Sequence, residues 1–157
     1  MKTYQKLLGA SCLALYLVGC GSGGESPVEI SKNSKGEFQI SSKADSVTIQ
    51  GVKLNRDNCV VNFIPVDQMG GLLILGLITP ISMQDFKDVA SVYKEFDRKE
   101  RVANIENKIS QLEQKGVMME YRTFKFGEKI EGISQGCNII EAEIQTDKGA
   151  WTFNFNR

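Results

Sequence analysis

The sequence contains no histidine among its 157 residues. Without imidazole, neither a Ser-His-Asp triad nor a Cys-His pair can activate a nucleophile, and every metal site that requires a histidine ligand is excluded. Basic and acidic side chains balance at 19 each, so the basic excess of a general nucleic-acid binder is also missing. We therefore expect no nucleic-acid partner, no metal and no cofactor.

The usual motifs of phosphate and calcium binding are missing as well, because the sequence has neither a P-loop nor the spacing of a calcium loop. Glu141 and Glu143 share one face of a predicted strand, and a glycosidase requires only two carboxyl groups at the right separation. A solvated sheet face explains this pair more simply. We expect the protein not to be an enzyme, with a carboxylate-dependent cell-wall hydrolase as a remote alternative.

The N-terminus has the pattern of an export signal. Lys2 and Lys6 supply a basic start without any acid, and residues 7–18 are almost wholly apolar. This apolar run is too short for a stable membrane span, which needs about 20 residues. It ends at residues 17–20 with the tetrapeptide Leu-Val-Gly-Cys.

This tetrapeptide resembles the lipobox of bacterial lipoproteins. The resemblance implies a signal peptide over residues 1–19, cleavage before Cys20, and diacylation of Cys20 as the mature N-terminus, which would hold the protein at the membrane. An ordinary signal peptide with an incidental cysteine is the alternative. Gly21 follows the cysteine, whereas an Asp there tends to retain proteobacterial lipoproteins at the inner membrane. We expect a cell-envelope location, with the outer membrane favoured in a Gram-negative host.

The mature chain is predicted to have a tether and one domain. Removing residues 1–20, which hold two bases and no acid, leaves 17 basic against 19 acidic side chains and a net charge of −2. Residues 20–36 then form the lipidated cysteine and a flexible, Gly- and Ser-rich tether. Residues 37–157 remain, which is enough for a single domain with a real core.

The remaining cysteines, Cys59 and Cys137, form an even pair in an exported domain and predict a disulfide. Such a bridge closes a long loop and contributes on the order of 4 kcal/mol in the chain-entropy model. Two free thiols, for redox chemistry or a metal, are the alternative, although no Cys-x-x-Cys spacing supports them.

Alternating apolar and polar residues predict several strands. The pattern begins at Phe38, shifts its phase at a predicted bulge at Gly51, and pauses at a turn over residues 55–58. Further strands are predicted over residues 59–64, 118–126 and 128–133. The clearest prediction is a C-terminal hairpin, with Ile140, Ala142, Ile144, Trp151, Phe153 and Phe155 on its dry face and Gly149 in its turn.

The middle of the sequence predicts helix over residues 83–115. Apolar residues recur there at spacings of three and four, with Ser82 as N-cap and Gly116 as the C-terminal stop. The apolar stripe slips across the charged residues 97–101, which indicates either a bend between two helices or a rotation of the buried face. The run has too few heptads for a free-standing coiled coil, so we expect the helices to pack on the sheet.

Residues 69–81 are the most hydrophobic stretch of the mature chain. They are too short to span a bilayer, and three glycines with a proline make a poor helix. The stretch fits a buried strand or crossover, an interfacial loop dipping into the membrane, or the wall of an apolar ligand or partner site. Under the last interpretation the surface residues are Leu72, Leu73, Leu75 and Leu77.

Together these patterns predict an α+β domain, in which a small antiparallel sheet or sandwich is stapled by one disulfide and carries a helical insertion between the bridged strands. Three segments, residues 122–129, 136–138 and 146–153, also resemble small uncharacterised bacterial envelope proteins, a resemblance that implies no activity. The leading functional hypothesis is a membrane-anchored, non-catalytic module that binds an envelope protein, as an assembly accessory or an exclusion or immunity factor. A carrier or sensor of an apolar ligand is the alternative.

Overall fold

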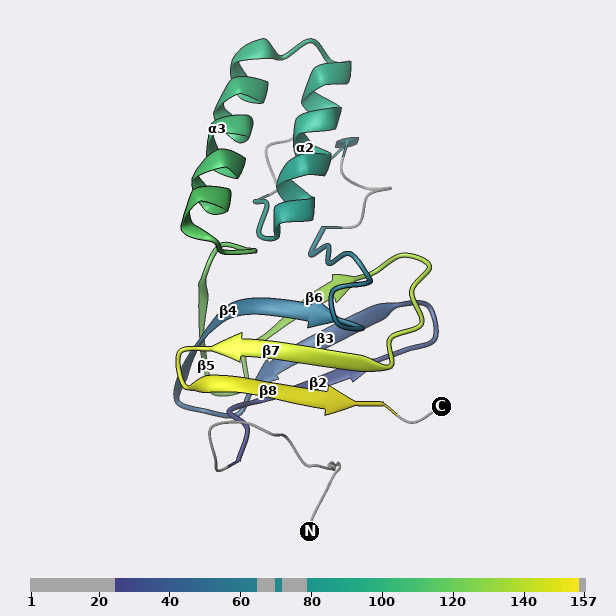
Figure 1. Cartoon of the computed structure of the whole chain (residues 1–157), viewed down its shortest axis with the longest axis vertical. Helices are drawn as coiled ribbons and strands as arrows, with labels where there is room; N and C mark the ends of the chain where they lie inside the picture. Colours follow the sequence, from purple (N-terminus) through teal and green to yellow (C-terminus); the bar gives the residue numbers. More distant parts are fainter. Residues whose placement is uncertain (1–24, 65–69, 72–78, 156–157) are drawn as a thin grey trace.

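The computed structural model of the chain describes residues 25–64, 70–71 and 79–155. Within these ranges the chain forms two antiparallel sheets and two helices (Figure 1). One sheet has the order β2 (Val28–Lys32), β3 (Glu37–Ser42), β6 (Lys129–Ile133), and the other has the order β5 (Arg122–Lys125), β4 (Ser46–Leu54), β7 (Glu141–Thr146), β8 (Gly149–Asn154). Helices α2 (Met83–Glu95) and α3 (Lys99–Lys115) lie between β4 and β5 in the chain. The predicted α+β class is confirmed.

The two sheets form a sandwich around one shared core. Alternate residues of each strand face inward, and the buried cluster draws on both sheets, including Ile40 of β3 and Ile144 of β7. In β4 the pairing with β7 shifts its register between Ile49 and Gly51. This irregularity lets Ile49 and Val52 both point into the core, so the predicted bulge at the glycine is confirmed.

The C-terminal hairpin is confirmed, with Ile144 opposite Trp151 and Gly149 at the turn with a φ of 129°. One residue departs from the predicted alternation: Ile140 is 37% exposed, whereas Ile139 is fully buried. The cause is local, because Oδ1 of Asn55 accepts the backbone N–H groups of Ile140 and Glu141, and β7 begins only at Glu141. The irregular backbone before β7 thus includes Ile140.

The folded part begins earlier than predicted. Residues 28–32, assigned to the tether by composition, form strand β2 and pair along their whole length with β3. Gly36, with a φ of 88°, closes the turn between the two strands. Val28 is buried in the core. The sequence did not predict this, because Val28 and Ile30 are the only apolar residues of this segment and serines and lysines surround them. The boundary at residue 37 is therefore wrong, and residues 28–36 belong to the domain.

Two predicted strands are shorter than their patterns. Residues 59–64 make only isolated bridges, at Cys59 and Asn62, because the next backbone N–H groups donate to the Asp85 side chain instead of to a strand. Residues 118–126 contribute a bridge at Met119, and β5 itself begins only at Arg122. The predicted strand over residues 128–133 is confirmed as β6.

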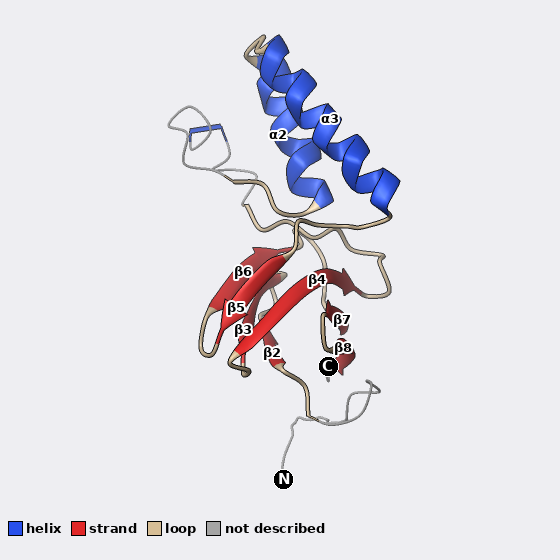
Figure 2. Cartoon of the chain, turned by 90° about the vertical axis from the view of Figure 1, so that its left-hand side faces the viewer, coloured by secondary structure: helices blue, strands red, loops and turns tan. Residues whose placement is uncertain are grey.

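The helical insertion consists of two antiparallel helices. Ser82 caps α2, and Gly116 ends α3 in the left-handed conformation, as predicted. The slip in the apolar stripe is a tight turn in which Asp97 has a φ of 55°. The expectation that the helices pack on the sheet is wrong, since they pack mainly against each other (Figure 2). The apolar stripe of each helix faces the partner helix, apart from the exposed Phe96 at the end of α2.

Strand β6 requires glycine at residue 132, and we expect Gly132→Ala to destabilise the fold by about 1–3 kcal/mol. A Cβ there would lie 2.4 Å from the Phe38 ring and 2.9 Å from the Asn62 carbonyl oxygen. The Phe38 ring is buried and packs edge-on against Phe63, so it has little room to withdraw. Urea unfolding measures the effect. Glu131→Ala, at an exposed position of the same strand, is the control, and equal stability of the two variants would contradict the prediction.

Candidate functional site

The helical hairpin, defined here as residues 82–116, projects from one end of the sandwich (Figures 1 and 2). In both views the described chain begins at the opposite end of the molecule, where β2 starts. Val89, Val92, Tyr93 and Ile105 fill the space between the helices together with Ile64 from the preceding loop. Because the helices use their apolar faces on each other, their remaining surface is polar and open to solvent.

The hairpin tip, residues 95–101, combines one aromatic side chain with charges of both signs. Phe96 is 50% exposed although it continues the apolar stripe of α2. Arg101 lies over the Tyr93 ring, 5.7 Å from its centroid, and Lys94 pairs with Glu106 at 3.1 Å across the two helices. The tip therefore presents an aromatic ring with a charged rim, on a scaffold that cross-links its own two helices.

The root of the hairpin is organised by one buried carboxylate, Asp85, which is 0% exposed. Its side chain completes a capping box with Ser82 and accepts the backbone N–H groups of residues 81 and 82 at 3.2 and 3.1 Å. It also accepts the N–H groups of Phe63 and Ile64, at 3.0 and 3.3 Å, and Nδ2 of Asn62 at 3.2 Å. One side chain thus ties the start of α2 to the chain leaving the sandwich.

The other side of the root is held by the segment that connects α3 to β5. The backbone pairs Met83 with Met118 and Glu120 with Ile81, each through one hydrogen bond, and Lys108 of α3 forms an ion pair with Glu120. The hairpin is therefore joined to the sandwich at two sides. Its direction relative to the sheets follows from these bonds and from the Asp85 cluster together.

The disulfide between Cys59 and Cys137 is present and joins residues 78 positions apart, which confirms the predicted pair. Asn55, in the left-handed conformation with a φ of 52°, organises its surroundings. The Asn55 Nδ2 group donates to the carbonyl of Asn138 at 2.9 Å, and its Oδ1 accepts the N–H of Ile140 at 2.8 Å. Neither cysteine lies in a strand, so the bridge links two loops.

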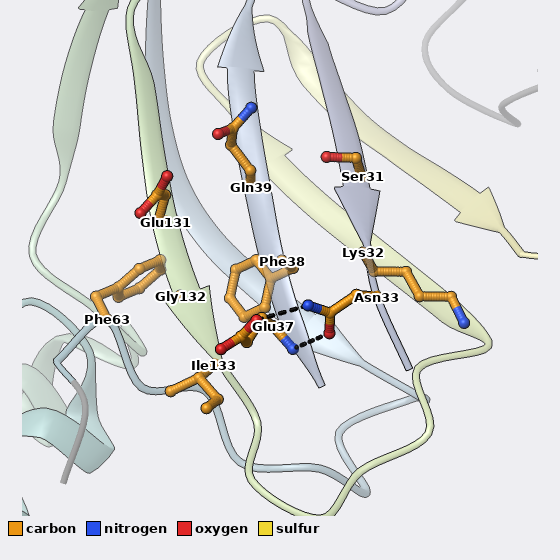
Figure 3. A pocket seen from close by; sticks show the side chains of 10 residues that line it. All are labelled: Ser31, Lys32, Asn33, Glu37, Phe38, Gln39, Phe63, Glu131, Gly132 and Ile133. Atoms are coloured by element: carbon orange, nitrogen blue, oxygen red, sulfur yellow. Dashed lines mark hydrogen bonds between the residues drawn. The ribbon is translucent and has the colours of Figure 1, made fainter. Parts of the chain in front are cut away.

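A hollow of about 450 Å³ opens on the three-stranded sheet (Figure 3). Phe38 and Phe63 meet edge-on there, with ring centroids 6.0 Å apart. The rim is polar, and Asn33 donates to Glu37 at 2.5 Å. The hollow is lined by Ser31, Lys32, Asn33, Glu37, Phe38, Gln39, Phe63, Glu131, Gly132 and Ile133. Its lining offers hydrogen-bonding groups and the two carboxylates of Glu37 and Glu131.

The two carboxylates considered for a hydrolase lie on the outer face of the four-stranded sheet and engage basic neighbours. Glu141 pairs with Arg56 at 3.4 Å, and Glu143 pairs with Lys53 at 3.8 Å. Glu143 also accepts a hydrogen bond from Gln145. These contacts are those of an ordinary cross-strand polar surface.

Residues 132–136, Gly-Ile-Ser-Gln-Gly, match the Gly-x-Ser-x-Gly spacing of a nucleophile elbow and were not predicted as a site. The structure places Ser134 at 1% exposure after β6, where no helix follows. Its backbone binds Gly36, whose missing Cβ leaves room for the Ser134 carbonyl. Oγ of Ser134 has no hydrogen-bond partner among the described residues. The serine therefore lacks the exposure that an elbow gives its nucleophile.

Several predicted site residues lie outside the described residues: Cys20, the signal peptide over residues 1–19, and the apolar residues Leu72, Leu73, Leu75 and Leu77. Three features were not predicted as sites: the Asp85 cluster, the exposed ring of Phe96, and the exposed ring of Phe126 between β5 and β6. The sequence could have predicted the capping role of Asp85, since this residue stands three positions after the predicted N-cap, Ser82. For Phe96 the pattern was misleading, because its helical spacing from the other apolar residues predicted a buried side chain.

The described part of the chain shows neither a metal cluster nor a membrane-spanning helix. It contains no cluster of three or more potential metal-ligating side chains, and none of its helices is both long and apolar enough to cross a membrane. Comparison of the whole chain with known protein families, curated proteins and solved structures finds no significant match.

Proposed function

We propose that this protein is a lipid-anchored protein of the bacterial cell envelope that binds a protein partner through its helical hairpin, without catalysis. The observation that carries the proposal is the hairpin itself: a rigidly rooted element that exposes Phe96 at its tip. An exposed aromatic ring with a polar rim is a common anchor at protein interfaces.

The anchor part of the proposal rests on the sequence. The lipobox-like residues 17–20 favour acylation of Cys20, and Gly21 favours the outer membrane if the host is Gram-negative. The described chain begins at the end of the sandwich opposite the hairpin (Figure 1). An anchor at Cys20 would therefore leave the hairpin tip pointing away from the bilayer, where a protein partner could reach it.

The contacts that hold the root of the hairpin support binding over a purely structural role. A helix pair that only stabilised the core would have its apolar surface on the sheet, whereas this pair extends from the sandwich and is held by the Asp85 cluster and the Lys108–Glu120 ion pair. A preformed surface loses less conformational entropy when a partner binds.

The test is site-specific photo-crosslinking in the native envelope. A photoreactive phenylalanine analogue in place of Phe96 is expected to capture one discrete protein. The same analogue in place of Tyr121, which is 51% exposed but lies outside the hairpin, is the matched control and is expected to capture none. In a Cys20→Ser variant that keeps a cleavable signal, the Phe96 adduct is expected to weaken, because the partner shares the membrane.

Other outcomes would contradict the proposal. No adduct from the Phe96 position, or equal adducts from both positions, would remove the hairpin as the binding surface. Co-purifying lipid in place of a protein adduct would instead favour the carrier interpretation. In that case Leu75→Asp should abolish lipid binding without unfolding the protein.

A further inference from the structure

The most exposed large apolar side chain of the described residues is Phe126, at 69%. It occupies the tight turn between β5 and β6, where Gly127 has a φ of 84°. The turn is held internally, since the Glu128 side chain accepts the backbone N–H of Lys125 at 2.7 Å. The chain thus fixes an aromatic ring in solvent on a short, ordered turn, with the exposed Lys125 and Lys129 on either side.

Backbone hydrogen bonds connect this turn to the beginning of the domain. The Gly127 N–H donates to the Ser42 carbonyl at 2.9 Å, and the Ser42 N–H donates to the Glu128 carbonyl at 2.8 Å. The next residue, Lys43, donates its N–H to the Pro27 carbonyl at 2.8 Å. The β5–β6 turn and the start of β2 accordingly lie at the same end of the sandwich, away from the helices (Figures 1 and 2).

The position of Pro27 limits the distance between this end of the sandwich and a lipid anchor at Cys20. Pro27 is seven positions after Cys20, and a fully extended chain of that length spans at most about 25 Å. An acylated Cys20 would therefore keep Phe126 close to the lipid surface. A Phe ring enters the boundary between headgroups and acyl chains readily, and lysines beside it can extend their ammonium groups toward lipid phosphates.

We propose that the Phe126 turn is a second membrane contact, which inserts its ring into the bilayer interface beside the acylated Cys20. This inference rests on the proposed lipid anchor. The apolar ring is the main attachment, because the nearby charges are mixed: Lys43 pairs with Glu29 at 3.9 Å, and Glu128 lies within the turn. With two attachments, the sandwich cannot tilt freely on its tether, and the hairpin points outward.

The experiment uses the full, exported chain, purified and reconstituted into phosphatidylcholine vesicles that contain brominated acyl chains, which quench nearby indoles. Phe126→Trp introduces a reporter at the turn, and Phe96→Trp introduces one at the hairpin tip as the matched control. The buried Trp151 provides a constant background that the wild-type chain measures. The expected result is a blue shift and loss of emission from the indole at residue 126, and neither change at residue 96.

The results separate this inference from the proposed function. Intact mass of the purified chain reports acylation first, and an unmodified Cys20 would overturn the anchor and this inference with it. An acylated chain whose indole at residue 126 remains unquenched would overturn the membrane contact alone. Equal quenching at residues 126 and 96 would also overturn it, because the protein would then lie flat or tumble on the surface.

Discussion

Replacing Asp85 by alanine is expected to destabilise the protein by about 3–5 kcal/mol, because several buried hydrogen-bond donors would lose their common acceptor. The carboxylate is fully buried and accepts the four backbone N–H groups of residues 63, 64, 81 and 82 and the side-chain amide of Asn62. Without it, these donors would lose their acceptor in a place with little access to water. Each such loss costs on the order of 1–3 kcal/mol before relaxation.

Urea unfolding, followed by Trp151 fluorescence and by far-ultraviolet circular dichroism, measures this effect on the sandwich and the helices. Asp88→Ala is the matched control, since Asp88 is a half-buried acid one turn later on α2 that accepts hydrogen bonds from Asn62 and Gln84. We expect it to cost about 1 kcal/mol, the usual net value of such bonds. A cost for Asp85→Ala as small as that of the control would show that the cluster does not fix the hairpin root.

The same substitution connects stability to the proposed function. If the Asp85 cluster sets the direction of the hairpin, a milder change such as Asp85→Asn should weaken the Phe96 adduct under conditions where the protein remains folded. The amide retains one acceptor oxygen and replaces the other with a donor that faces N–H groups. An unchanged adduct in a folded, destabilised Asp85→Asn chain would separate the root of the hairpin from binding.

Removing the disulfide has the second large expected effect. The double variant Cys59→Ala, Cys137→Ala is expected to lose about 4 kcal/mol, because the bridge closes a loop between residues 78 positions apart and so restricts the unfolded chain. The loop contains the whole helical hairpin. Loss of the disulfide therefore acts mainly by raising the conformational entropy of the unfolded chain, and it removes few contacts from the folded protein.

Reductant provides the internal control for this prediction. Wild-type protein should lose about the same stability in dithiothreitol, whereas the stability of the double variant should not change. Chemical unfolding with and without reductant gives both numbers. Alkylation of both thiols in the exported protein without reductant would contradict the bridge itself.

Several features of this protein follow from the sequence alone because they depend on near neighbours. The C-terminal hairpin, the bulge at Gly51 and the caps at Ser82 and Gly116 are set by a period of two or 3.6 residues and by the few residues that tolerate special backbone angles. The cysteine pair belongs here too, since Cys59 and Cys137 are the two cysteines that remain once residues 1–20 are set aside, and two cysteines allow one pairing.

The tertiary structure decided what depends on competition between distant groups. Residues 59–64 have the composition of a strand, but Asp85, more than twenty residues later, accepts the backbone N–H groups of Phe63 and Ile64, so the pairing stops at the isolated bridge of Asn62. Periodicity identifies an apolar helix face without saying what covers it, and here the second helix rather than the sheet does so. Likewise, Phe126 lies in an ordinary turn by sequence, and only the hydrogen bonds through Ser42 and Lys43 place it beside the start of the domain.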